Sequence, residues 1–228
     1  MILGLVVSLA VVAAFVDAAA AVRRAALPAA VSPVVVTALG IGVLLAASGI
    51  PVARFTELTR PLHPVLGPAI VALGAGVHAN RRMFAAIGRP LAVAIIVGTL
   101  TGIASAAALA RGLGLGPLLT AATLTRTAST PFAVLVQSRT GGPVPLAAGL
   151  AVATGVIGAV LLPAAFRLCG VRDPVVIGTA TGVAAHLVGA EAVGRRDPVA
   201  GAFAGAALAG AGVLTALLVP PLWHWLGG

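Results

Sequence analysis

The chain alternates long apolar runs with short breaks that hold polar, proline or glycine residues. Runs without a charged residue occur at 25–53, 61–80, 90–110, 140–166 and 198–228. Most are long enough for a helix to cross a hydrocarbon core of about 30 Å. The runs are apolar throughout, whereas the strands of a membrane barrel would alternate apolar and polar positions. The pattern therefore predicts an all-α polytopic membrane protein.

The breaks between the runs define the expected helices. We expect them near 2–20, 31–49, 62–79, 89–110, 117–137, 144–168, 174–193 and 199–222. This gives about seven or eight transmembrane helices, some of them broken or re-entrant. We treat residues 1–228 as a single transmembrane domain.

Two stretches of the chain resemble each other. "PVLGPAIVALGAGVHANRR" at 64–82 and "PVVIGTATGVAAHLVGAEAVGRR" at 174–196 both open with Pro-Val, carry a histidine and close on a double arginine. Transporters built from internal repeats show such halves, here about 1–112 and 117–224, with the substrate site between them. Chance similarity in a chain this rich in Ala, Gly and Val is the alternative.

Composition narrows the class of protein. Hydrophobic residues make up 60% of the chain and charged residues 8%, and a mean hydropathy of +1.15 excludes an ordinary soluble domain. The net charge of +9 comes from 14 arginines, mainly in short connections, which favours a role in topology over nucleic-acid binding. The single Cys169 excludes an internal disulfide and a cysteine-based metal cluster. We expect no metal and no cofactor.

Enzymatic motifs are missing from the sequence. It contains no P-loop, HExxH, GxSxG or CxxC pattern, so ATP-driven transport by this chain, zinc proteolysis and serine hydrolysis have no support. We expect that the protein is not an enzyme.

The stretch "TLTRTASTPFAVLVQSRTGG" at 123–142 places polar residues inside an apolar segment. Thr130 followed by Pro131 has the form of a helix N-cap with proline at the first helical position. The free N–H groups of such a helix start, the hydroxyls of Thr127, Ser129 and Thr130, and Arg126 would together form a site for a carboxylate. In the alternative, the residues form a loop and Arg126 extends to a lipid headgroup.

A second polar group lies in "GTATGVAAHLVGAEAVGRRD" at 178–197. His186 falls near the middle of a predicted span, where a histidine can bind an anion or carry a proton. Gly182 and Gly189 would let this helix bend or approach a neighbour closely, and Glu191 is a candidate supporting residue. The alternative is a structural histidine that is hydrogen-bonded to a backbone carbonyl.

The chain resembles the LrgB/CidB family, which includes bacterial membrane proteins described as holin-like or antiholin-like and the plastid glycolate/glycerate translocator of plants. Five stretches carry the resemblance through their order and spacing: "LGPAIVAL" (66–73), "LTRTASTPFAV" (124–134), "GVIGAVLLP" (155–163), "RDPVVIGTATGVAAHLVGAEA" (172–192) and "GAFAGAALAGAGVLTALLVPPL" (201–222). The resemblance implies transport of small carboxylates such as pyruvate, glycolate or glycerate. It also implies a small LrgA/CidA-like membrane partner.

The family patterns match this chain only in part. Against the family's "LPKSVTTP", Arg126 stands where lysine is usual and Thr127 where serine is usual, while Ser129, Thr130 and Pro131 keep their character. Against "GTAAHGIGTARA", His186 and Gly189 are kept. The usual threonine and arginine beyond them are Ala190 and Ala192.

These observations lead to a hypothesis with alternatives. The protein is a secondary transporter of small monocarboxylates in the cytoplasmic (inner) membrane, with an anion site at Arg126, Thr127, Ser129 and Thr130. His186 is a second ligand or a proton carrier, and helices alternate access. A holin-like or antiholin-like protein without a specific substrate is the first alternative. A non-transporting partner subunit is the second. The small residues at 201–212 allow close helix approach, so we also expect a homo-oligomer, for example a dimer.

Overall fold

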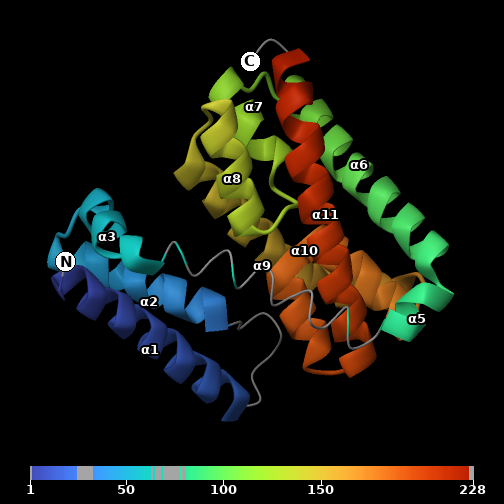
Figure 1. Cartoon of the computed structure of the whole chain (residues 1–228), viewed down its shortest axis with the longest axis horizontal. Coiled ribbons are helices and arrows are strands. Elements are labelled where there is room, and N and C mark those ends of the chain that lie inside the picture. Colours follow the sequence, from blue (N-terminus) through green and yellow to red (C-terminus); the bar gives the residue numbers. More distant parts are fainter. Residues whose placement is uncertain are drawn as a thin grey trace. The chain divides into compact units, whose positions relative to one another are not determined.

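The computed structural model describes residues 2–24, 33–62, 64, 68, 78 and 81–225, and these residues form helices and connecting turns (Figure 1). The chain divides into two compact units, Met1–Ala72 and Leu73–Gly228. Five helical stretches are long and apolar enough to cross a membrane: Ile2–Ala21, Gly88–Gly112, Val144–Leu168, Pro174–Gly194 and Pro198–Trp225. The prediction of an all-α polytopic membrane protein is therefore confirmed.

The first unit contains α1 (Ile2–Arg24), α2 (Pro33–Ser48), α3 (Val52–Leu58) and the short η1 (Arg60–Leu62). α1 packs against the other three elements, and the Ser8 hydroxyl donates to the Leu58 carbonyl at 3.4 Å. α2 and α3 meet at a bend of 120°. Gly49 adopts a φ of +65° there, and Pro51 is the N-cap of α3. The predicted span at 31–49 therefore ends in a sharp turn.

The second unit contains the remaining helices. They are α5 (Arg81–Ala86), α6 (Gly88–Gly112), α7 (Pro117–Leu124), α8 (Thr130–Thr140), α9 (Val144–Leu168), α10 (Pro174–Gly194) and α11 (Pro198–Trp225). The predicted spans at 89–110, 144–168, 174–193 and 199–222 correspond to α6, α9, α10 and α11. Asp173 caps α10, since its carboxylate accepts hydrogen bonds from the N–H groups of Val175 and Val176 at 2.7 and 3.3 Å.

α10 lies at the centre of this unit and packs against α6, α9 and α11. Its closest neighbour is α11, because Gly178 and Gly182 lie directly against the backbone of Ala200 and Ala204. The small-residue stretch at 201–212 is therefore used for packing within the chain. The homo-oligomer that this stretch suggested stays a prediction.

The expected third span, 62–79, and the first of the two similar stretches, 64–82, lie largely outside the described residues. The internal repeat with halves at 1–112 and 117–224 therefore stays a prediction.

The packing of α10 on α11 makes a testable prediction. Gly182→Ala should lower the free energy of unfolding by about 1–3 kcal/mol, because the new Cβ would overlap the Ala204 backbone, with Ala204 Cα at 2.8 Å. Thermal unfolding of the detergent-purified protein measures the effect. Gly205→Ala is the matched control, since nothing lies within 4 Å of a Cβ at that position. Equal melting temperatures for the two variants would contradict this packing.

Candidate functional site

The predicted segment 117–137 is a helical hairpin and not a single crossing helix. α7 has 8 residues and α8 has 11, which correspond to roughly 12 and 17 Å of helix and are too short to cross a membrane alone. Gln137 Nε2 of α8 donates to the Ala121 carbonyl of α7 at 2.7 Å and to the Thr125 hydroxyl at 3.2 Å. Because residues 16 positions apart are in contact, α8 must fold back along α7. Residues 125–129 form the tip of the hairpin.

The helix start within this segment lies one residue earlier than predicted. Ser129, with extended φ and ψ of −66° and 153°, is the N-cap of α8, so Thr130 is already helical. The N–H groups of Phe132 and Ala133 donate to the Ser129 carbonyl at 2.9 and 3.0 Å, and Pro131 has no N–H. The first turn therefore offers fewer free backbone donors than expected, and the site depends on side chains.

Arg126 lies in the hairpin tip and is half-buried. Its Nη2 donates to the Ser105 hydroxyl of α6 at 3.0 Å, and its Nε is buried without a hydrogen-bond partner. No ion pair of Arg126 with an acidic side chain occurs in the part of the chain that the structure describes. The guanidinium therefore has donors left for an anion.

A cavity of about 690 Å³ adjoins the hairpin tip. Its walls are one face of α6, the first half of α10, and Arg126 and Thr127 of the tip. The residues that α6 and α10 contribute follow helical spacing. They include Ile87, Leu91, Ala94, Gly98, Thr101 and Ser105 from the first wall and Val175, Val176, Thr179 and Val183 from the second.

Two glycines bring α6 close to the other walls of the cavity. A Cβ at Gly98 would lie 2.9 Å from Val183 Cγ1, and one at Gly102 would lie 3.0 Å from Thr127 Oγ1. Gly98 and Gly102 are one helical turn apart, which is the spacing that permits close helix packing in membranes. The glycines thus hold α6 against both α10 and the hairpin tip.

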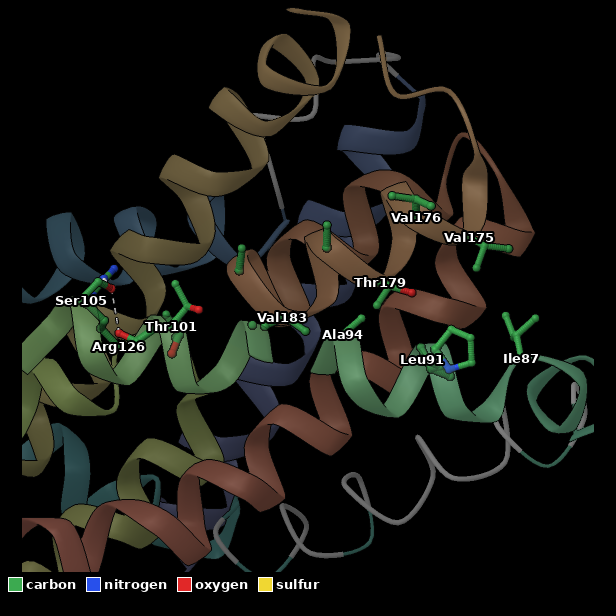
Figure 2. A pocket seen from close by; sticks show the side chains of 16 residues that line it. Ile87, Leu91, Ala94, Thr101, Ser105, Arg126, Val175, Val176, Thr179 and Val183 are labelled. Atoms are coloured by element: carbon green, nitrogen blue, oxygen red, sulfur yellow. Dashed lines mark hydrogen bonds between the residues drawn. The ribbon is translucent and has the colours of Figure 1, made fainter. Parts of the chain in front are cut away.

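The cavity is polar at one end and apolar at the other (Figure 2). Arg126, Ser105 and Thr101 lie together at one end, whereas Ile87, Val175 and Val176 lie at the other. A guanidinium with neighbouring hydroxyls is suited to a carboxylate, which can accept two parallel N–H bonds. Apolar walls with a few converging polar groups are typical of a small-molecule site.

His186 lies outside this cavity lining. It is 2% exposed, and its Nε2 lies 2.7 Å from the Ala151 carbonyl of α9. The structure thus places His186 against α9 and does not bring it to Arg126. A hydrogen bond to a backbone carbonyl is the arrangement expected of a structural histidine.

His186 also interrupts α10. Its φ of 37° and ψ of −130° are non-helical, and a side chain larger than that of glycine rarely adopts this positive φ. The Nδ1 atom is buried without a hydrogen-bond partner. α10 therefore consists of two helical pieces, and its first piece lines the cavity.

The remaining predicted site residues lie near the cavity or in α10. Thr127 lines the cavity, whereas Ser129, 5% exposed, and the half-buried Thr130 lie beside it without lining it. Gly189 lies after the break in α10 and against the first piece of the same helix, since a Cβ there would lie 2.7 Å from Thr181 Cγ2. Glu191 is half-buried after the break. Ala190 packs in an apolar cluster with Ala204 and Leu208, so at this position apolar contacts replace the expected polar group.

A comparison with protein families matches residues 11–225 to the LrgB-like family. The chain belongs to this family. A Haemophilus influenzae protein described as uncharacterized is 26% identical over 187 residues, which cover 82% of this chain and 80% of the relative. Plastidal glycolate/glycerate translocator 1 of Arabidopsis thaliana is 30% identical over 154 residues, which cover 67% of this chain but only 30% of the translocator. The comparison with solved structures found no match.

The site of this LrgB-like protein also contains residues that the sequence analysis missed. Ser105 and Thr101 reach the cavity from α6, Thr179 reaches it from α10, and Gln137 closes the hairpin. Thr101 and Ser105 are four residues apart in a largely apolar helix, so they share one face. A search for lone hydroxyl or amide residues at helical spacing would have found them.

Gln137 gives the prediction for this site. Gln137→Leu should lower the free energy of unfolding by about 1–3 kcal/mol, because it removes the donor shared by the Ala121 carbonyl and the Thr125 hydroxyl in a buried position. The melting temperature in detergent measures this change. Ser138→Ala is the control, since that exposed hydroxyl bonds only the Leu135 carbonyl of its own helix. A Gln137→Leu variant as stable as the control would mean that the hairpin does not depend on this side chain.

Proposed function

We propose that this LrgB-like protein is a secondary transporter of small monocarboxylates of the pyruvate, glycolate and glycerate class, acting in the cytoplasmic membrane. The observation that carries the proposal is Arg126, a half-buried guanidinium with an unpartnered Nε, at the polar end of a cavity. Thr127 and Ser105 add hydroxyl groups beside it.

The energetics of a charge inside a membrane protein support an anionic ligand. An ionisable side chain in such a setting is costly unless it is paired, and such residues usually face the protein interior or a water-filled path. In the described residues, Arg126 bonds a neutral hydroxyl and no carboxylate. A substrate carboxylate would supply the missing negative charge and accept bidentate hydrogen bonds. When the substrate leaves, the Arg126 guanidinium would again lack a negatively charged partner.

The interrupted helices support transport over a purely structural role. Transporters commonly form their sites from discontinuous helices, and one group of helices moves against another to alternate access. Here the hairpin tip at 125–129 and the break at His186 interrupt two segments of one unit. The similarity to a protein named as a glycolate/glycerate translocator supports the same substrate class.

Proton coupling through His186 is part of this proposal. A buried imidazole with one nitrogen on a carbonyl and the other unpartnered can take up and release a proton. Because His186 separates the two pieces of α10, a change in its charge would act on the piece that lines the cavity. Glu191, after the break, is the proposed supporting residue. A small LrgA/CidA-like membrane partner and a homo-oligomeric state are further expectations.

The proposal predicts that Arg126→Gln abolishes substrate exchange. Counterflow of labelled pyruvate, glycolate and glycerate in liposomes should fall at least about 30-fold, because the carboxylate loses its charged partner. Arg139→Gln is the matched control, since Arg139 is an exposed arginine in the last turn of α8 and does not line the cavity. Release of a trapped dye from the same liposomes measures non-specific leak.

The outcomes separate the candidate functions. Saturable exchange that is lost in Arg126→Gln but kept in Arg139→Gln supports a carrier with its site at the hairpin tip. Exchange that survives in Arg126→Gln would remove Arg126 from the site. Dye release without exchange would favour the holin-like alternative, and neither activity would favour a partner subunit that does not transport.

A further inference from the structure

We propose that the apolar end of the cavity receives an aliphatic tail, so that the preferred substrates are monocarboxylates with an unbranched apolar chain. The carboxylate binds at Arg126, and the tail extends along α6 and α10 toward Ile87 and Val176. Straight-chain 2-oxo acids longer than pyruvate should therefore bind more tightly than pyruvate, glycolate and glycerate, which fill only the polar end. This inference rests on the proposed function and specifies the substrate of the same site.

The size of the cavity is the first argument. A volume of about 690 Å³ equals that of on the order of 20 water molecules and lies within the range of sites that hold much larger ligands than glycolate. A two- or three-carbon acid would contact only the groups near Arg126. Most of the wall would remain without a ligand.

The shape of the cavity is the second argument. Its α6 wall runs from Ile87 to Ser105, a length of roughly 27 Å along the helix axis. Arg126 bonds Ser105 at one end of this wall, and Ile87 lies at the other (Figure 2). The charge and the apolar surface are therefore arranged along one line, as they are in a carboxylate with an extended tail.

The chemistry of the wall is the third argument. Val183, Ala94 and Leu91 succeed one another beyond the polar end (Figure 2), and among the described residues that line the cavity Arg126 is the one with a charged side chain. Thr179 contributes the hydroxyl on the α10 side. A methylene group on this wall gains free energy by leaving water. A hydroxyl group on a longer chain would lose hydrogen bonds to water there and find few partners.

The test is inhibition of labelled pyruvate exchange in liposomes by unlabelled straight-chain 2-oxo acids of increasing length, up to 2-oxooctanoate. Half-inhibiting concentrations should fall about fourfold for each added methylene, which corresponds to about 0.8 kcal/mol per buried CH₂. A dye-release control reports any damage that the longer acids do to the bilayer.

A matched pair of variants locates the effect. Val183→Thr places a hydroxyl on the wall without changing the shape of the side chain. It should reduce the ratio between the half-inhibiting concentrations of pyruvate and 2-oxooctanoate at least about threefold. Val219→Thr makes the same change at a buried valine of α11 that does not line the cavity. It should leave the ratio as it is in the unmodified protein.

Each result has a distinct meaning. Potency that rises with chain length and depends on Val183 supports the inference. Exchange that is insensitive to chain length overturns it and leaves the transporter itself in place. A failure of every acid to exchange or inhibit would refute the proposed function, and the inference with it.

Discussion

The two hydrogen bonds that Gln137 donates across the α7–α8 hairpin determine where Arg126 lies. They join α8 to the Ala121 carbonyl of α7 and to the Thr125 hydroxyl at the start of the hairpin tip. In a buried, apolar setting an amide without these partners would cost more than it does in water. The fold-back of α8 is thereby stabilised, and the chain must turn at 125–129. The tip then carries the guanidinium to the Ser105 hydroxyl of α6.

Small residues allow the rest of the second unit to close around this tip. Gly98 and Gly102 let α6 approach Val183 and Thr127, and Gly178 and Gly182 let α10 contact the α11 backbone. Helices in a membrane gain little from hydrophobic burial against one another and depend on such close contact. The separation of the cavity walls is therefore set where the side chains of Val183 and Thr127 pack against the α6 glycines.

The long helices were predictable from the sequence because each is a continuous apolar run between proline, glycine or aspartate signals. The predicted span at 174–193, for example, begins where α10 does, at Pro174. The hairpin was not predictable as a fold-back, because residues 117–137 are long enough to cross a membrane and the bond that folds them joins Gln137 to a residue 16 positions earlier. Arg126 was singled out from its type and neighbours alone. Its partner Ser105 was missed because that contact joins different helices.

The break at His186 separates the part of α10 that lines the cavity from the rest of the helix. A backbone in a sparsely populated conformation costs of order 1–3 kcal/mol and persists only where surrounding contacts hold it. Here the Ala151 carbonyl holds the His186 ring from α9, and Gly155 leaves the room that the ring occupies, since a Cβ there would lie 2.5 Å from His186 Cε1. The first piece of α10 is thus not joined to the second by continuous helix. In the proposed transport cycle, proton uptake at His186 would therefore act on the piece that carries Thr179 and Val183.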